Sequence, residues 1–378
     1  MTSNEYYLQE YITTRGLGKK TEKSMRYMLN HYSTFQGLSL HELILEADTE
    51  EDNGIRWKRR KLKHRLINYM IYCKDNMKLS SAKSYVKAVK GFYSHHEIEI
   101  GKLPAWNLKN ANVSEPITAD DLPTRQIIRD AVELSEPKMR ALILFLVSTG
   151  MSRVDCLSLS IQDFITATYP YHQSDDMNTA LDILSECKDD IIPAFKLRRS
   201  KTNKYFITFC SPEAVNEIIN YLRIRDKRNK RYHRPLLKPS DKLFQISNSH
   251  FDVKFNDLNN ALGLGKAGTF NRFRGHMLRK FHASQLEKYG MSRYLVNVLQ
   301  GKSNGSVDDV YFFEDEDTLR NEYVKALEGV LILTDVREID VYSDEYLLIK
   351  QENIELKERF DKMQKDIDAI KEWYIFDD

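Results

Sequence analysis

The N-terminal hundred residues repeat hydrophobic side chains at intervals of three and four, the spacing that gathers them on one face of a helix. Three segments carry this pattern, namely 21–35, 57–75 and 80–96. Each predicts an amphipathic helix, and together they predict a helical N-terminal domain.

The stretch 101–123 interrupts this periodicity with glycine, prolines and asparagines, which predicts a linker between domains. Beyond it, the apolar segment 137–150 predicts a buried helix that ends at Gly150, and a further helix begins within 151–159. The segments 191–199 and 205–210 favour strands, and the polar turn "SKTNK" between them predicts a β-hairpin. Helical periodicity resumes over 211–235.

The expected fold class is therefore mostly α with a small antiparallel β-sheet, divided into domains at 1–110 and 111–325, with a C-terminal helical tail at 326–378. The tail repeats apolar residues at heptad spacing, interrupted by one asparagine. One column is Tyr346, Asn353, Phe360, Ile367 and Tyr374, and the other is Ile349, Leu356, Met363 and Ile370. This pattern predicts either a coiled coil or a single amphipathic helix lying on its own body.

Composition excludes several classes of protein. No run of about 18 apolar residues occurs and the first residues lack the layout of a signal peptide, so we expect neither a membrane span nor secretion but a cytoplasmic location. The cysteines at 73, 156, 187 and 210 are scattered, which argues against a disulfide framework, a zinc site or a thiol catalyst. We expect them to be buried as small hydrophobic residues.

The net charge of +2 conceals an uneven distribution. Residues 314–378 hold 20 acidic and 9 basic side chains, whereas residues 1–313 hold 48 basic and 35 acidic ones. A basic body favours a polyanionic partner, and the basic helices of the N-terminal domain are the candidate contacts with DNA, the alternative being ordinary solvated helices. The candidate DNA-binding residues are Arg56, Lys58, Arg59, Arg60, Lys61, Lys63, Lys83, Lys87 and Lys90.

The nucleotide-binding, zinc-protease and serine-hydrolase motifs are absent from the sequence. In "RGHMLRKFHAS", however, His276 and Arg279 lie three residues apart and so share a helical face. A histidine beside an arginine suits a phosphate group, because a guanidinium donates a planar pair of hydrogen bonds and stays charged.

Three further residues complete a set that can cleave a phosphodiester without metal: Arg153 at a helix start, Lys201 in the hairpin turn and Tyr311 after a glycine-containing loop. Arginines can stabilise the charge on the non-bridging oxygens, and a tyrosine oxygen can attack phosphorus and hold the strand covalently. A lysine can protonate the departing 5′ oxygen.

With these residues in place, the chain resembles the tyrosine recombinase (phage integrase) family over residues 1 to about 313. The segments that carry the resemblance, in family order, are "STGMSRVDCLSL", "RRSKTNKYFITF", "HMLRKF" and "GKSNGSVDDVY". The N-terminal "LSSAKSYVKAVKGFY" is similar to the last helices of the family's core-binding domain, and "GMSRVDCLSLSIQDF" is similar to archaeal integrases in particular.

The resemblance implies that Arg153 and Arg279 clamp the phosphate, His276 transfers a proton, and Tyr311 is the nucleophile. It implies Lys201 as general acid, although Lys204 in the same turn stays an alternative. The sequence departs from the family twice. Ser152 stands where the family has its first arginine, which shifts Arg153 by one residue, and Lys302 stands where the family has histidine or tryptophan.

The resemblance also implies a C-shaped clamp of two domains, four protomers on two double-stranded attachment sites, and strand exchange through a Holliday junction with no metal and no other cofactor. The free protein would be a monomer or weak oligomer associated with DNA in the cytoplasm. Integration of a mobile element is favoured over chromosome-dimer resolution. The alternatives are a catalytically weak DNA-binding accessory protein, a topoisomerase of the same mechanism, and a metal-dependent nuclease that uses the acids around Tyr311.

Overall fold

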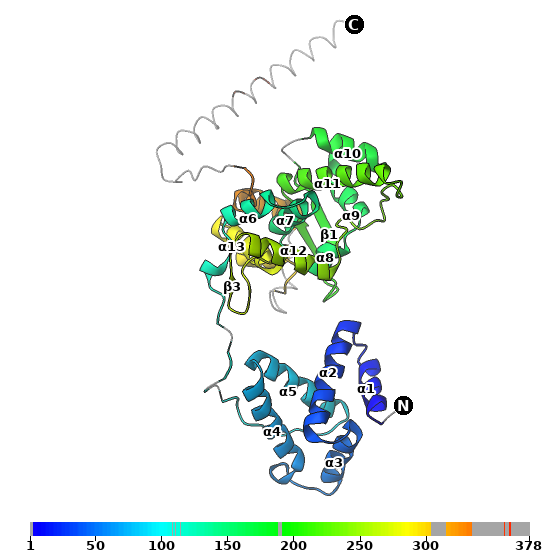
Figure 1. Cartoon of the computed structure of the whole chain (residues 1–378), viewed down its shortest axis with the longest axis vertical. Coiled ribbons are helices and arrows are strands. Elements are labelled where there is room, and N and C mark those ends of the chain that lie inside the picture. Colours follow the sequence, from blue (N-terminus) through cyan, green and yellow to red (C-terminus); the bar gives the residue numbers. More distant parts are fainter. Residues whose placement is uncertain are drawn as a thin grey trace. The chain divides into compact units, whose positions relative to one another are not determined.

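The computed structural model describes residues 3–107, 109, 111–113, 115–187, 191–303 and 315–334, together with 359 and 363. The chain forms two compact units, Met1–Ile117 and Thr118–Asp378 (Figure 1). The division falls inside the predicted linker 101–123, seven residues after the expected boundary at 110. The predicted coiled-coil columns lie outside the described residues, except Met363.

The first unit consists of helices packed around an aromatic core. Its elements are α1 (Ser3–Thr14), α2 (Lys19–Gln36), α3 (Leu40–Asp52), the 3₁₀ turn η1 (Trp57–Arg59), α4 (Lys61–Asn76) and α5 (Leu79–His95). Helix α5 packs against α2 and α4, and the fully buried rings include Tyr32, Tyr69, Phe92 and Tyr93. The three helices predicted from periodicity are confirmed as α2, α4 and α5, but the middle one begins at Lys61 and not at residue 57, because Arg60 is extended and separates it from η1.

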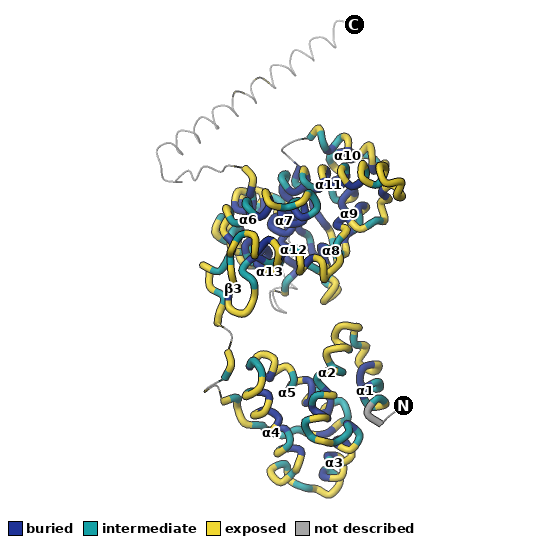
Figure 2. Tube along the Cα trace, viewed as in Figure 1, coloured by how far each residue is buried: buried dark blue, intermediate teal, exposed yellow. Residues whose placement is uncertain are grey.

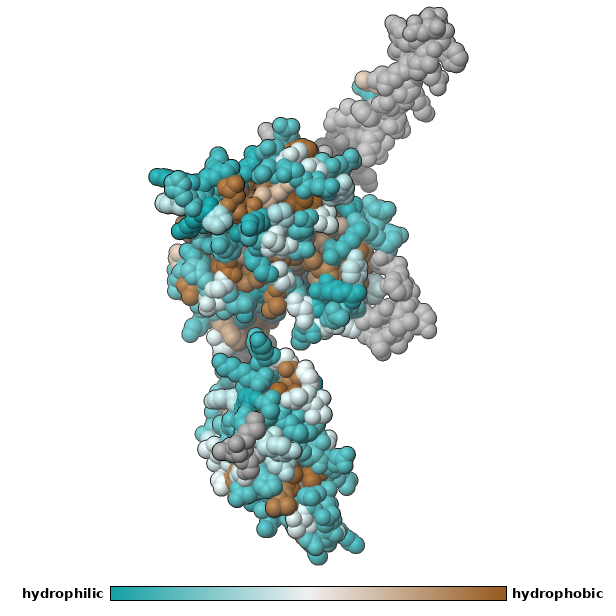
Figure 3. Space-filling view, turned by 90° about the vertical axis from the view of Figure 1, so that its right-hand side faces the viewer, coloured by the Kyte–Doolittle hydropathy of each residue, from teal (hydrophilic) through white to brown (hydrophobic). Residues whose placement is uncertain are grey.

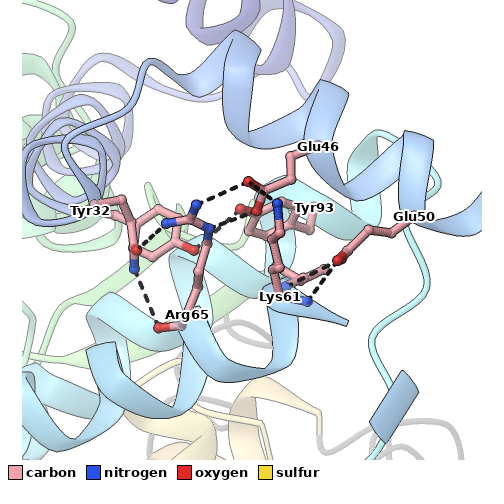
Figure 4. A network of polar contacts seen from close by, with 8 residues as sticks. Tyr32, Glu46, Glu50, Lys61, Arg65 and Tyr93 are labelled. Atoms are coloured by element: carbon pink, nitrogen blue, oxygen red, sulfur yellow. Dashed lines mark hydrogen bonds and ion pairs between the residues drawn. The ribbon is translucent and has the colours of Figure 1, made fainter. Parts of the chain in front are cut away.

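A polar network fastens α3 to the start of α4 (Figure 4). The Arg65 guanidinium donates two hydrogen bonds to the Glu46 carboxylate, at 2.8 and 3.0 Å. The Glu50 carboxylate accepts from the backbone N–H of Lys61 at 2.8 Å, at the point where α4 begins without a capping side chain of its own. Glu50 therefore satisfies a helix N-terminus that would otherwise lack an acceptor.

The second unit surrounds one buried helix. Its elements are η2 (Ala119–Asp121), α6 (Arg125–Glu133), α7 (Pro137–Thr149), α8 (Arg153–Ser158), α9 (Ile161–His172), α10 (Met177–Glu186), β1 (Ala194–Arg198), β2 (Tyr205–Phe209), α11 (Pro212–Arg231), α12 (Asn248–Ala261), β3 (Lys266–Ala267), β4 (Phe270–Asn271), α13 (Gly275–Lys288), α14 (Arg293–Leu299), α16 (Glu316–Lys325) and η3 (Leu327–Val330). Helix α7 is buried on all sides and packs against α6, α11 and α13 (Figure 2). This confirms the buried helix expected to end at Gly150.

The sheet structure of the described residues is small. Strands β1 and β2 pair antiparallel with Ala194 opposite Phe209 and Arg198 opposite Tyr205, which confirms the predicted hairpin. A second antiparallel pair joins Lys266–Ala267 to Phe270–Asn271. The single small sheet of the expected fold class is thus two separate two-stranded sheets.

Residues 315–334 pack on the second unit itself. Tyr323 of α16 is fully buried, and its hydroxyl donates to the Ser148 carbonyl at 3.0 Å. The Glu213 carboxylate accepts from the N–H groups of Ile332, Leu333 and Thr334 at 2.7 to 2.8 Å. Residues 326–334, expected to begin the tail, therefore extend the body of the second unit.

The face in Figure 3 and the cysteines show how the hydrophobic residues are distributed. Hydrophilic residues cover most of the face in Figure 3, with hydrophobic residues scattered among them. None of the helices in the described ranges has the length and apolar character needed to cross a bilayer. Cys73, Cys156 and Cys210 are buried as predicted, whereas Cys187 is only half-buried because it lies at the C-terminal end of α10.

Candidate active site

A cavity of about 640 Å³ opens in the second unit where the start of α8, helix α12 and the start of α13 meet. Arg153, His276 and Arg279, predicted as site residues from segments far apart in the sequence, all line it. The other charged side chains of its lining are Arg199, Arg274 and Asp252. Four arginines therefore face one carboxylate among the lining residues.

Arg153 is the first residue of α8, because Ser152 is the N-cap. The Ser152 hydroxyl accepts from the Asp155 N–H at 3.3 Å and donates to the Asp155 carboxylate at 2.7 Å. Ser152, which stands where the resemblance leads us to expect an arginine, therefore caps the N-terminus of α8. The Arg153 guanidinium pairs with Asp252 at 2.5 Å and lies over the Phe251 ring at 5.5 Å.

Arg279 is buried and holds two backbone carbonyls. One terminal nitrogen donates to the Gly150 carbonyl at 2.6 Å and the other to the Gln300 carbonyl at 2.8 Å. Burial, then the neighbouring Arg199, lowers the pKa of Arg279 to about 10, an effect that Asp155 partly opposes. At neutral pH Arg279 is a fixed cation with no carboxylate paired to it in the described residues.

His276 lies one turn before Arg279 on α13 and is exposed at the mouth of the cavity. Desolvation of its ring lowers the pKa of His276, and the cations Arg274, Lys280 and Arg279 lower it further. The imidazole is therefore neutral at pH 7, in the form that accepts a proton.

The turn that leads toward Tyr311 is held by two guanidiniums. Arg199 donates to the Gly301 carbonyl at 2.8 Å, while Arg279 holds the preceding Gln300. Gly301 has φ +62° and lies so close to the Phe206 ring that a Cβ would approach it to 2.9 Å, so a side chain cannot replace it without strain. Tyr311 itself lies outside the described residues.

Lys302 follows this turn and is half-buried. Desolvation lowers its pKa, and the positive charges of Arg279 and Arg199 lower it further. Lys302 is not among the cavity-lining residues.

Lys201 is exposed in the hairpin turn and does not line the cavity in the described structure. The buried Asp155 carboxylate accepts from the Ser200 N–H at 2.8 Å, which ties this turn to α8. Asp155 therefore positions the hairpin turn that carries Lys201 relative to the helix that carries Arg153. The Lys204 carbonyl closes the same turn by accepting from the Arg199 N–H at 2.8 Å.

Sequence reasoning missed Arg199 and Arg274, which also line the cavity. The Nε of Arg274 is buried without a hydrogen-bond partner, and its guanidinium lies over the Phe270 ring at 4.3 Å. Burial lowers the pKa of Arg274. Such an arginine is suited to an anion, since a bound oxyanion would supply the missing acceptors. Its place two residues before His276 was the only available signal.

In the first unit, most of the candidate DNA-binding residues are open to solvent. Arg56, Lys58, Arg59 and Lys61 are exposed around η1 and the start of α4, and Lys63 is half-buried. Arg60 differs, because its guanidinium donates to the Glu51 carboxylate and to the Ile55 carbonyl, the latter at 2.8 Å.

Lys83, Lys87 and Lys90 lie on one exposed face of α5 and line a groove of about 1000 Å³. Arg15 also lines this groove, a basic residue that the sequence patterns did not single out. Gly91 lets the Tyr11 hydroxyl approach, because a Cβ there would lie 3.2 Å from it. The groove is lined by more basic than acidic side chains, as a phosphate backbone requires.

Comparison with solved structures gives matches to integrases and recombinases. The Tn1549 transposon integrase in complex with a circular intermediate DNA matches with a TM-score of 0.50 and 13% identity, over 85% of this chain and 98% of that chain. The chain shares the fold of this integrase. The XerA recombinase matches with a TM-score of 0.33 and 18% identity, over 85% and 96% of the two chains. A lambda integrase dimer bound to a core site matches with a TM-score of 0.38 and 14% identity, over 82% and 97%.

At this level of identity the likeness concerns the fold alone. No protein-family model matches the chain, and no curated protein matches it either.

Proposed function

We propose that the protein is a site-specific DNA recombinase that cuts and rejoins DNA through a 3′-phosphotyrosine intermediate. The observation that carries the proposal is the cavity that brings Arg153, His276 and Arg279 together, across 126 residues of sequence, in a cationic setting. A phosphodiester is the anion that such a set of guanidiniums and one neutral imidazole would bind and activate.

In the proposed reaction, the Tyr311 oxygen attacks the scissile phosphorus and the bond to the 5′ oxygen breaks. Arg153 and Arg279 stabilise the charge that develops on the non-bridging oxygens, and His276 accepts the tyrosine proton. Lys201 protonates the 5′ oxygen, so that a free 5′ hydroxyl leaves. Attack by a 5′ hydroxyl on the phosphotyrosine reverses these steps and reseals the strand.

Lys302 would donate a hydrogen bond to the phosphate. Lys302 is half-buried, and desolvation and the positive charges of Arg279 and Arg199 lower its pKa; an anion bound nearby would relieve this repulsion, which supports the role. The exposed basic residues of η1, α4 and α5 would contact the DNA backbone on the first unit.

The proposal extends to a pair of double-stranded attachment sites held by four protomers, each closing its two units around DNA as a clamp. Strands would exchange through a Holliday junction, in the integration of a mobile element. The Tn1549 integrase, a transposon protein solved with circular intermediate DNA, supports this context by its shared fold.

A second candidate is a DNA-binding protein that cleaves weakly or not at all. Ser152 occupies the family's arginine position as a helix cap, and Arg153 is already paired with Asp252. If Arg153 stays committed to Asp252 on DNA, one guanidinium of the clamp is lost.

A covalent-trapping assay tests the proposal. A binding site is first selected from a random pool of duplex DNA, and nicked versions of it are then incubated with the protein in EDTA. When the nick lies just downstream of the cleaved phosphate, the short fragment that carries the free 5′ hydroxyl diffuses away. The strand cannot be resealed, so the phosphotyrosine adduct accumulates. We expect a slower band on a denaturing gel with the wild type and with Tyr205→Phe, an exposed tyrosine of β2 chosen as control. Tyr311→Phe should give none.

The outcomes separate the candidates. A covalent band that persists in Tyr311→Phe would refute the assigned nucleophile. Tight binding without any covalent band in the wild type would favour the DNA-binding candidate. Cleavage that requires Mg²⁺ and leaves no covalent protein would indicate a nuclease.

A further inference from the structure

Three side chains with metal-binding atoms converge in the first unit. Glu10 projects from α1, His95 is the last residue of α5 and His96 is the C-cap of that helix. Their carboxylate oxygen and ring nitrogens all lie within 4.8 Å of one another. Residues from the beginning and the end of the unit therefore meet at one point.

The distances suit a single ion held among these atoms. The His95 Nε2 lies 3.1 and 3.2 Å from the two Glu10 oxygens, and the His96 Nε2 lies 3.9 Å from one of them. Four-coordinate zinc with bonds of about 2.0–2.1 Å separates neighbouring ligand atoms by about 3.4 Å. All the ligand atoms lie within 4.8 Å of one another, so changes of at most about 1.4 Å in their separations would bring them to this value.

Hydrogen bonding alone leaves part of this cluster unexplained. The contact between Glu10 and His95 is an ordinary hydrogen bond, but the His96 Nε2 is buried without a hydrogen-bond partner. Its separation of 3.9 Å from Glu10 is too long for a hydrogen bond. A buried ring nitrogen without a partner is costly, and coordination of a cation would supply the partner.

Aromatic rings surround the two imidazoles. The His96 ring packs edge-on against Tyr7 and Phe92, with centroids 5.3 and 4.8 Å away, and the His95 ring packs against Tyr11 at 5.0 Å. The two side chains keep only 16% and 13% of their surface exposed. Such packing fixes the ring orientations and limits access of water, as the surroundings of metal sites commonly do.

We propose that Glu10, His95 and His96 bind one divalent transition-metal ion, with zinc as the ion that two imidazoles and one carboxylate suit best. Water completes the coordination. The ion fastens α1 to the end of α5 and thereby stabilises the first unit; it takes no part in the reaction proposed for the second unit, and its test does not depend on that reaction.

Isothermal titration of the chelator-treated full-length protein with zinc chloride tests the proposal, with Co²⁺ as a second probe because tetrahedral Co²⁺ absorbs visible light. We expect one zinc per chain, a higher melting temperature with zinc, and a visible Co²⁺ spectrum. His96→Ala and the nearly isosteric Glu10→Gln should each weaken zinc binding by at least about ten-fold, whereas His64→Ala, at an exposed histidine of α4, should bind as the wild type does.

Absence of saturable zinc binding to the wild type would overturn the proposal whatever the variants do. So would binding that Glu10→Gln and His96→Ala leave intact, or that His64→Ala weakens equally, since the zinc would then lie on other surface histidines. Circular dichroism of the metal-free variants establishes that each is folded before it is titrated.

Discussion

Mild acid should destabilise the second unit through one buried histidine. His282 of α13 has no exposed surface, and its Nδ1 accepts from the Gln300 amide at 3.0 Å while that amide also donates to the Arg279 carbonyl. Burial, with the positive charges of Arg279 and Lys302, lowers the pKa of His282 to about 3. The ring is therefore neutral in the folded protein throughout the mildly acidic range.

The sign and size of the effect follow from linkage. In the unfolded chain His282 titrates near its ordinary pKa of about 6.5, so stability is complete above that pH and falls as the unfolded state takes up a proton. Between pH 7.5 and pH 5.0 this uptake removes about 2 kcal/mol. This loss of stability comes almost entirely from protonation of His282 in the unfolded chain, because at pH 5.0 the ring in the folded protein is still neutral.

Pulsed thiol labelling in urea measures this loss for each unit separately. Cys156 and Cys210 are buried in the second unit and report its unfolding, while Cys73 is buried in the first unit and serves as internal control. His282→Phe removes the titrating group at the expense of the Gln300 hydrogen bond, about 1 kcal/mol at any pH.

The test compares the pH dependence of the unfolding free energy in the wild type and in His282→Phe. We expect the wild type to lose about 2 kcal/mol more than His282→Phe between pH 7.5 and pH 5.0, as reported by Cys156 and Cys210. Equal pH dependence in the two proteins would refute the reasoning, because the buried histidine would then contribute nothing to acid sensitivity.

Three further predictions concern the second unit. Arg274→Ala should slow covalent trapping about 100-fold, and part of this loss should be regained on a neutral methylphosphonate linkage. Arg272 lies outside the cavity lining, so Arg272→Ala should cleave normally. Equal trapping by both variants would contradict a phosphate contact. Gly150→Ala should cost roughly 2–4 kcal/mol by Cys210 labelling, since φ is +58° and a Cβ would lie 2.5 Å from the His282 ring; a smaller loss would mean that the ring can move. Glu213→Ala should speed hydrogen exchange of the backbone amides it holds by at least about ten-fold, and unchanged exchange would show that other contacts hold them.

Features set by local chemistry could be predicted from the sequence. The end of α7 follows from Gly150, whose positive φ a helix C-cap requires, and the hairpin follows from two β-forming segments around a polar turn. By contrast, α9 and α10 were not predicted. Helix α9 contains Pro170, a residue that usually interrupts a helix, and α10 has only 10 residues, too few to repeat the spacing of three and four that marked α2 and α5.

The site could be predicted only in part, because motif spacing identifies positions along the chain and not the direction of a side chain. It selected Arg153 and Arg279, which line the cavity, but it gave no reason to choose Arg274 over the nearby Arg272. In the first unit, counting positive charges could not distinguish the exposed Arg59 from Arg60, whose guanidinium is bound to Glu51. Burial and partners, which decide both cases, arise only in the folded chain.

The shifted arginine has a physical explanation in the structure. Ser152 caps α8, and the Asp155 that it contacts also holds the Ser200 N–H, so one carboxylate joins the helix start to the hairpin turn. An arginine at position 152 would remove the side chain that caps the helix. With Arg153 one residue later, the helix keeps its cap and a guanidinium still lines the cavity, although Asp252 now neutralises it. The unpaired Nε of Arg274 then becomes the part of the cavity lining most in need of an anion, which is why that arginine is the sharpest place to probe the proposed chemistry.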